Sequence, residues 1–228
     1  MSAETRELTL AVSHRIGSVD ALLVRPADAR WLLVLGHGAG AGMRHHVLEG
    51  LVTACSAHGI ATLRYQFPYM QRGSKRPDTA EMLQATVRSA VHAAGLVGEG
   101  LPLLAGGKSM GGRMTSQEQA ERPLHGVQGL VFFGFPLHPV GAPAMTRGDH
   151  LARVHIPMLF LQGDRDRLAD LHLLRTTLGP LGAKATLALL EGGDHDLRVG
   201  GRDAPAPEQV YDWAAGQVAA WAVRHASH

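Results

Sequence analysis

The chain has 228 residues, of which 45% are hydrophobic, and its formal net charge is +2 with histidine neutral. This length and apolar content predict a single domain, residues 1–228, that buries a substantial core. Charged residues make up 18% of the chain, which argues against a disordered protein. The basic residues are scattered rather than striped, so we expect no nucleic-acid partner.

Signals for membranes or export are missing from the sequence. Residues 1–12 carry two glutamates and no apolar core of a signal peptide. No apolar run approaches the roughly 20 residues that a membrane span needs. Cys55 is the only cysteine, so no internal disulfide can form, and we expect it to be a small core residue. The sequence therefore predicts a cytoplasmic protein with no membrane partner.

Strand and helix patterns alternate along the chain, which is typical of a mostly parallel sheet with helices on both faces. The first two strands, joined through Gly17-Ser18, have the spacing of an antiparallel hairpin. Asp78 is the expected N-cap of the second helix and Gly95 its stop. The predicted strands are 8–12, 21–25, 31–35, 60–65, 101–105, 127–133, 158–162 and 184–190. The predicted helices are 45–58, 78–94, 113–121, 167–178 and 207–224.

Ser109 lies in the segment 107–111 (GKSMG), between an apolar strand and a helix. This segment fits G-x-S-x-G, the nucleophile elbow of α/β-hydrolases. So tight a turn imposes an unfavourable backbone conformation on the serine, and flanking glycines remove Cβ atoms that would collide. The helix that follows also points unpaired N–H groups at whatever the hydroxyl attacks.

A serine nucleophile needs a base, and the base needs a carboxylate that orients it. In α/β-hydrolases these residues follow in the order Ser, acid, His, each beyond the C-terminal end of a strand. Asp166 follows one predicted strand and His195 follows the last, at the sheet edge where ligands bind. The sequence therefore predicts a triad of Ser109, Asp166 and His195.

The acid has a second candidate in Asp164, which we rank below Asp166 because Asp166 ends the pattern G-x-x-D. Asp194 and Asp196 flank His195 directly. Sequence neighbours rarely turn back onto the same ring, so we expect these two aspartates to make loop or solvent contacts.

The segment 36–40 (GHGAG) follows the third strand, where hydrolases carry the loop that completes the oxyanion hole. The backbone N–H groups of Ala39 and Met110 are the predicted oxyanion donors. We expect His37 to shape this loop, with a substrate contact as its alternative role. Other histidines lack the spacing of metal ligands, so we predict no metal site and no cofactor.

Two phosphate-binding patterns overlap the same segments. Residues 107–109 resemble the end of G-x-x-x-x-G-K-[ST], but Pro102 stands where the first glycine is required. Residues 36–41 fit G-x-G-x-x-[GA], and Arg64 would be available for a 2′-phosphate. A dinucleotide site is the weaker interpretation because it leaves the predicted triad without a role.

The chain resembles small α/β-hydrolases of the KANL3/Tex30 type, which are related to the dienelactone-hydrolase-like proteins. The resemblance implies the α/β-hydrolase fold, the same triad and the same oxyanion donors, and says little about substrate. Dienelactone hydrolases proper carry cysteine as nucleophile, and Ser109 departs from that. The matching segments are GHGAGAGMRHH (36–46), RYQFPYMQRGSKRPD (64–78), GGKSMGGR (106–113), QGDRD (162–166) and GGDHDL (192–197).

Access to the predicted site depends on the segment between residues 133 and 156. α/β-hydrolases often insert a cap domain there, but this connection is short and rich in Pro and Gly, so we expect no cap and an open site. Arg72, Lys75 and Arg76 are candidate contacts for an anionic substrate group, although a solvated loop is the plainer interpretation. Arg113 is expected to tie loops together rather than to touch substrate.

These observations predict a lidless serine hydrolase for small or short-chain carboxylic esters or thioesters. Its partner is a small-molecule ester, and its oligomeric state is left open. The alternative, from a different class, is a catalytically idle protein of the same fold that serves as a binding module or scaffold.

Overall fold

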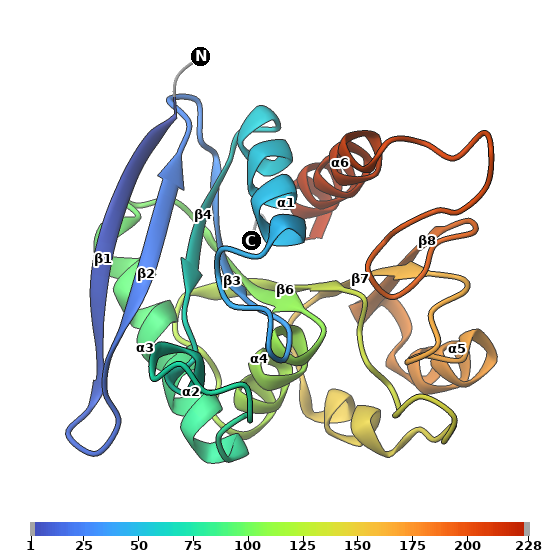
Figure 1. Ribbon diagram of the computed structural model, residues 1–228, viewed down its shortest axis with the longest axis horizontal. Helices are drawn as coiled ribbons and strands as arrows, with labels where there is room; N and C mark the ends of the chain where they lie inside the picture. Colours follow the sequence, from blue (N-terminus) through green and yellow to red (C-terminus); the bar gives the residue numbers. More distant parts are fainter. Residues whose placement is uncertain (1–2, 226–228) are drawn as a thin grey trace.

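The computed structural model describes residues 3–225, and its strands form one eight-stranded sheet (Figure 1). The strand order is β1-β2-β4-β3-β5-β6-β7-β8. β1 and β2 form the predicted antiparallel hairpin, and β2 is also antiparallel to β4. All later neighbours are parallel. The predicted mostly parallel α/β architecture is confirmed.

The elements alternate along the chain as follows. The strands are β1 (Glu4–Ser13), β2 (Gly17–Arg25), β3 (Trp31–Gly36), β4 (Ile60–Tyr65), β5 (Leu103–Lys108), β6 (Val127–Phe133), β7 (Met158–Gly163) and β8 (Ala185–Leu190). The helices are α1 (His46–Ala57), α2 (Pro68–Gln71), α3 (Ala80–Val97), α4 (Met110–Glu121), α5 (Leu171–Leu178) and α6 (Pro207–His225). Two 3₁₀ helices complete the set, η1 (Thr146–Arg153) and η2 (Gly179–Lys184).

Each face of the sheet has its own apolar core, because successive side chains of a strand point to opposite faces. In β3, Leu32 and Val34 belong to the core that contains residues of α3, α4 and α5, whereas Leu33 and Leu35 belong to the core that contains residues of α1 and α6. Figure 1 shows α1 and α6 together on one side of the sheet and α3 and α4 on the other. Cys55 lies in the second core, as predicted, and burial raises the pKa of its thiol to about 12.

Several predicted boundaries were wrong because tertiary contacts decide them. Helix α3 begins after Thr79 rather than at Asp78, whose carboxylate instead accepts a hydrogen bond from Arg72 at 2.6 Å. The helix also continues through Gly95 to Val97, so that glycine is not its stop. A single glycine costs a helix only about 1 kcal/mol, which packing against the sheet overcomes. The short elements α2 and η1 were not predicted.

The connection between β6 and β7 carries no cap domain. Residues 134–157, all of which the structure describes, contain one 3₁₀ helix, η1, and otherwise loops. The C-terminal edge of the sheet is therefore left open, as the length of this segment predicted.

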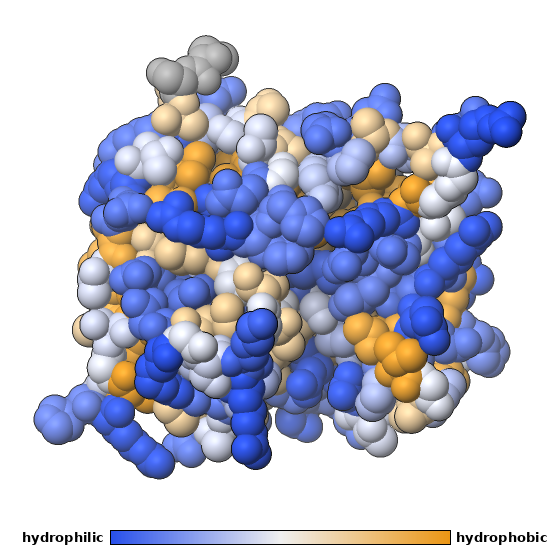
Figure 2. Space-filling model, viewed as in Figure 1, coloured by the Kyte–Doolittle hydropathy of each residue, from blue (hydrophilic) through white to orange (hydrophobic). Residues whose placement is uncertain are grey.

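The face of the molecule seen in Figure 2 is predominantly polar. Figure 2 shows charged and polar residues over most of the visible face, with apolar residues in small separate groups. Among residues 3–225, no helix is long and apolar enough to cross a membrane.

Replacing either of two glycines by alanine tests the fold, because one substitution should lower the free energy of unfolding and the other should raise it. A Cβ at Gly106 would lie 1.8 Å from the carbonyl oxygen of Val131, and backbone cannot move aside, whereas Gly95 lies exposed in α3 with open space around it. We expect Gly106→Ala to lower the free energy of unfolding by at least roughly 1–3 kcal/mol. Gly95→Ala should raise it by about 0.5–1 kcal/mol. Chemical denaturation measures both; a stable Gly106→Ala variant would contradict this packing.

Candidate functional site

Ser109 occupies a strained turn between β5 and α4. Its φ is 51° and its ψ is −117°, which a residue with a side chain rarely adopts. The turn is held because the Ser109 N–H donates to the carbonyl of Phe133 at 3.2 Å. A Cβ on Gly107 or Gly111 would lie 2.4 or 2.3 Å from the carbonyl oxygen of Gly36. The glycines around Ser109 are therefore required by close backbone contact, as the sequence indicated.

The three residues of the predicted triad form one chain of hydrogen bonds. His195 Nδ1 lies 2.7 Å from Asp166 Oδ2, and His195 Nε2 lies 2.8 Å from Ser109 Oγ. A carboxylate accepts hydrogen bonds, so Nδ1 carries the proton and Nε2 accepts from the serine hydroxyl. This arrangement can remove the hydroxyl proton as the oxygen attacks an electrophile.

Asp166 is the carboxylate that contacts the histidine. Its side chain is fully buried, and it also accepts hydrogen bonds from the Leu168 N–H at 2.7 Å and from the Gln162 amide. These bonds fix the carboxylate in place. Among residues 3–225, Asp164 makes no hydrogen bond or ion pair with His195, and its Oδ1 is buried without a partner. The geometry favours Asp166 over Asp164 as the orienting acid.

Glycines let the loops of the site approach one another. A Cβ on Gly163, where β7 ends, would lie 2.2 Å from the carbonyl oxygen of Gly193. A Cβ on Gly134, where β6 ends, would lie 2.8 Å from the carbonyl oxygen of His195. The loop that carries His195 is thus packed directly against the ends of two strands.

The loop after β3 lies beside the serine. A Cβ on Gly38 would be 3.7 Å from Ser109 Cβ, and Ala39 and Met110 line the same pocket as Ser109. Within residues 3–225, the backbone N–H groups of Ala39 and Met110 donate to no acceptor. Two free donors next to a nucleophile can stabilise an oxyanion.

His37 is fully buried beneath this loop. Its Nδ1 donates to the carbonyl of Gly38 at 2.7 Å, and its Nε2 accepts from the Phe67 N–H at 3.0 Å. Burial lowers the pKa of His37 to about 4, so the ring is neutral. Both nitrogens are bound to backbone, which leaves the ring to shape the loop and leaves no nitrogen for a substrate.

The pocket at Ser109 holds about 420 Å³, within the range of small-molecule sites. Arg113 and Arg147 line it, together with Asp78. The candidates Arg72 and Lys75 do not line it, although the Arg72 guanidinium pairs with Asp78. The basic residues that line the pocket are thus not the ones that the sequence offered as candidates.

An ion pair beside the triad was not predicted. Lys108 is 7% exposed in its side chain, and its Nζ lies 3.3 Å from Asp196, which is 45% exposed. Burial lowers the pKa of Lys108, and Asp196 opposes that shift. The pair joins the residue before Ser109 to the residue after His195. Asp194, by contrast, accepts from the Asp196 and Arg198 N–H groups, which is the expected loop contact.

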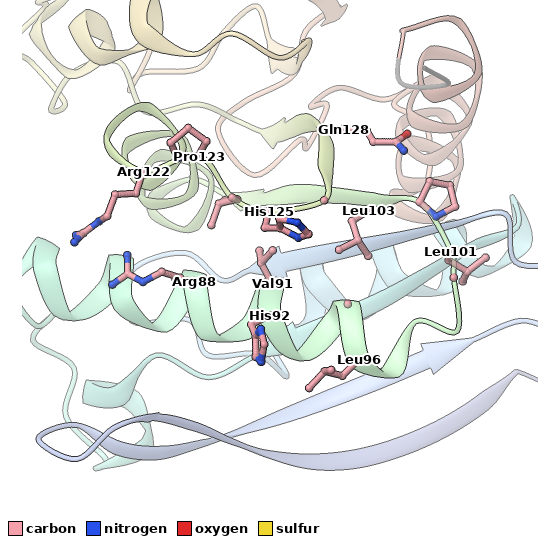
Figure 3. A pocket seen from close by; sticks show the side chains of 15 residues that line it. Arg88, Val91, His92, Leu96, Leu101, Leu103, Arg122, Pro123, His125 and Gln128 are labelled. Carbon is pink, nitrogen blue, oxygen red and sulfur yellow. The ribbon is translucent and has the colours of Figure 1, made fainter.

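A second hollow lies at the opposite end of the sheet strands and is lined by residues of α3 and of the segment after α4 (Figure 3). It holds about 650 Å³ and is lined by Arg88, Leu96 and His125 among others. No member of the Ser109 hydrogen-bond chain lines it. The N-terminal strand ends form this hollow, so it is separate from the site at the carboxyl ends. In the described part of the chain, no group of three His, Cys, Asp or Glu side chains is placed to hold a metal ion.

Comparison with known families agrees with this geometry. Residues 29–223 match the family described as the alpha/beta hydrolase domain. The chain belongs to that family.

Solved structures that resemble this α/β-hydrolase domain share its fold over nearly the whole chain. One is a Xanthomonas campestris protein described as an α/β serine hydrolase without lid, at 20% identity, covering 96% of this chain and 95% of that one, with a TM-score of 0.74. Another is a dienelactone hydrolase from Anabaena variabilis, at 18% identity, covering 99% and 100%, with a TM-score of 0.76. A third is the esterase domain of a Rhodothermus marinus protein, at 15% identity, covering 98% and 100%, with a TM-score of 0.72.

Removal of Asp196 should destabilise the protein more than removal of Lys108. Asp196→Asn leaves a buried ammonium without its counter-charge, whereas Lys108→Met leaves a half-exposed carboxylate in water. We expect Asp196→Asn to lower the free energy of unfolding by about 1–3 kcal/mol at pH 7, and Lys108→Met to lower it clearly less. Thermal unfolding measures the difference, with Glu7→Gln, which removes the exposed partner of Arg44, as a near-neutral control.

The same variants should differ in their pH dependence. The pKa of Lys108 is lower in the folded chain, so the penalty for its buried charge is present at neutral pH and disappears as pH rises past the ordinary lysine pKa. The deficit of Asp196→Asn relative to Lys108→Met should therefore shrink between pH 7 and pH 10. A deficit that stays constant over that interval would contradict a charged Lys108.

Proposed function

We propose that this α/β-hydrolase is a serine hydrolase that cleaves small or short-chain carboxylic esters or thioesters. Ser109 Oγ attacks the carbonyl carbon while His195 Nε2 takes the hydroxyl proton. Asp166 holds the imidazole in the required tautomer and stabilises its charged form. The proton then passes to the leaving alcohol or thiol, and an acyl-enzyme forms on Ser109. Water, activated by His195, releases the acid and restores the serine.

The Ala39 and Met110 N–H groups are the proposed oxyanion donors. Negative charge develops on the carbonyl oxygen only in the transition state, so fixed donors there lower the barrier without binding substrate more tightly. Met110 is the first residue of α4, and the helix dipole adds to the same effect. His37 is proposed to hold the Ala39 loop in place rather than to contact substrate.

The observation that carries the proposal is the continuous hydrogen-bond chain from Ser109 through His195 to the buried Asp166. An idle scaffold of the same fold has no need of this chain or of two free N–H donors beside it, which is why we rank that alternative second. The narrower resemblance to the KANL3/Tex30 type is part of the proposal. A single domain, a cytoplasmic location and the absence of nucleic-acid or membrane partners stay predictions from the sequence.

Loss of the nucleophile tests the class directly. We expect wild-type protein to hydrolyse a short-chain nitrophenyl ester and to be labelled by a fluorophosphonate at Ser109. Ser109→Ala should lose both, with a fall in kcat/KM of several orders of magnitude and an unchanged thermal midpoint. A folded wild-type protein that neither hydrolyses esters nor takes the label would favour the idle scaffold.

The two neighbouring aspartates provide a matched pair of variants. Asp166→Asn removes the acceptor of His195 Nδ1–H, so the tautomer that accepts from Ser109 is no longer favoured, and we expect turnover to fall by about 10⁴. Asp164→Asn, two residues away, should stay within roughly tenfold of the wild type because it does not contact the ring. The opposite ranking would show that Asp164 is the orienting acid.

The open site predicts a preference for short acyl chains. Without a cap there is little apolar wall for a long chain, whose burial would be worth about 0.8 kcal/mol per methylene. A butyrate ester should match or exceed a palmitate ester in kcat/KM, and micelles should not activate the enzyme. A tenfold advantage of the palmitate ester would require an acyl-binding channel and would contradict this view.

A further inference from the structure

Two guanidinium groups lie at the pocket beside Ser109. Arg113 lies in the first turn of α4, four residues after Ser109, which is the N-cap of that helix, and its N–H donates to the Ser109 carbonyl at 3.1 Å. Arg147 comes from η1, in the short connection between β6 and β7. Both line the pocket together with Ser109, Ala39 and Met110.

Neither guanidinium has a counter-ion within residues 3–225. Arg113 is partly buried, and its Nε is fully buried without a hydrogen-bond partner. The charge that acts on Arg113 is another cation, Arg147; burial first and this like charge second lower the pKa of Arg113. A buried donor left unpaired and a repelling neighbour both cost stability, which is typical of a binding site without its ligand.

The other titratable groups nearby do not neutralise the two arginines. His150 is buried, its Nε2 lies 2.7 Å from Ser116 Oγ, and burial together with the fields of Arg113 and Arg153 lowers its pKa to about 4. Asp78 also lines the pocket; its Oδ1 pairs with Arg72 at 2.6 Å, its Oδ2 is buried without a hydrogen-bond partner among residues 3–225, and neither oxygen pairs with Arg113 or Arg147. Arg113 and Arg147 therefore contribute two positive charges to the wall of this pocket that no carboxylate among residues 3–225 pairs with.

We propose that Arg113 and Arg147 bind an anionic group of the substrate, a carboxylate or a phosphate, and so select charged esters over neutral ones. This inference rests on the proposed ester hydrolysis at Ser109 and names its substrate class. It also replaces two expectations from the sequence, since the loop with Arg72 and Lys75 does not line the pocket and Arg113 is not engaged in tying loops together.

The chemistry of the two side chains fits this role. A guanidinium presents a planar set of donors that matches the two oxygens of a carboxylate or phosphate, and a pair of guanidiniums that repel each other is relieved by an anion between them. Since Arg113 lies one helical turn from the nucleophile, an anion held there fixes a small ester with its carbonyl near Ser109. The volume of about 420 Å³ is sufficient for a small ester of this kind.

A pair of substrates that differ in one group tests the inference. Monomethyl succinate and methyl butyrate have the same leaving group and differ only by a carboxylate in place of the terminal methyl. We expect the wild-type kcat/KM to be at least tenfold higher for monomethyl succinate at low ionic strength, and the ratio to fall as salt is added. The ratio of the two values should drop at least tenfold in Arg113→Gln and in Arg147→Gln.

The ratio separates charge recognition from general damage, because a disturbed fold or triad lowers both rates together. Arg15→Gln, in the exposed β1–β2 turn, is the matched control and should keep the wild-type ratio. Equal hydrolysis of the two esters by the wild type, or an unchanged ratio in both pocket variants, would overturn anion recognition while Ser109-dependent hydrolysis stands. No Ser109-dependent hydrolysis of either ester would overturn the proposed function, and this inference with it.

A binding measurement covers the case in which the pocket variants do not fold. Succinate and glycerol phosphate, each at the same ionic strength, should slow the labelling of wild-type Ser109 by a neutral fluorophosphonate. The stronger protector identifies carboxylate or phosphate as the preferred group, and sodium chloride at equal ionic strength is the control. Labelling at the same rate in all three solutions would overturn the inference.

Discussion

The contact between two backbone turns is the constraint on which the candidate site depends. The carbonyl oxygen of Gly36, at the end of β3, lies where a Cβ of Gly107 or Gly111 would be 2.4 or 2.3 Å away. Only glycine permits this approach, which brings the loop after β3 against the start of α4. The positive φ of Ser109 is maintained by that packing and by its bond to the β6 carbonyl of Phe133. Ser109 and the N–H groups of Ala39 and Met110 thus lie on two backbone turns that pack directly against each other.

The fold was largely predictable because its main signals are local. Continuous apolar runs such as β3 mark strands covered on both faces, and glycines mark their turns. The ends of elements were less predictable where side chains take part in hydrogen bonds outside the helix or strand. Helix α5 begins at Leu171 rather than at 167, because Asp166 and the residues after it form the turn that orients the acid, and Asp170 caps the helix. Such hydrogen bonds depend on contacts between distant segments, and the hydrophobic periodicity of the sequence does not reveal these contacts.

Some residues of the candidate site were likewise predictable from the sequence, and others were not. The positions of Ser109, Asp166 and His195 follow from chain order and from the rule that parallel strands end at one edge, so their convergence was predictable, while their roles stay proposals. Lys108 and Arg147 carry no comparable signal. Lys108 occupies a variable position of the elbow pattern and finds Asp196 only after folding. Arg147 lies in a segment without periodicity, and its place beside Arg113 depends on how η1 packs against α4.

The burial of Cys55 has a practical consequence for work on thioesters. The chain has one thiol, it is 0% exposed, and its pKa of about 12 leaves almost no thiolate at neutral pH. In the folded chain, a thiol-specific dye would therefore report only the thiol that the proposed cleavage of a thioester releases. The same dye reacts with the protein itself once α1 separates from the sheet, so one reagent reports catalysis in the native state and the opening of this core on denaturation.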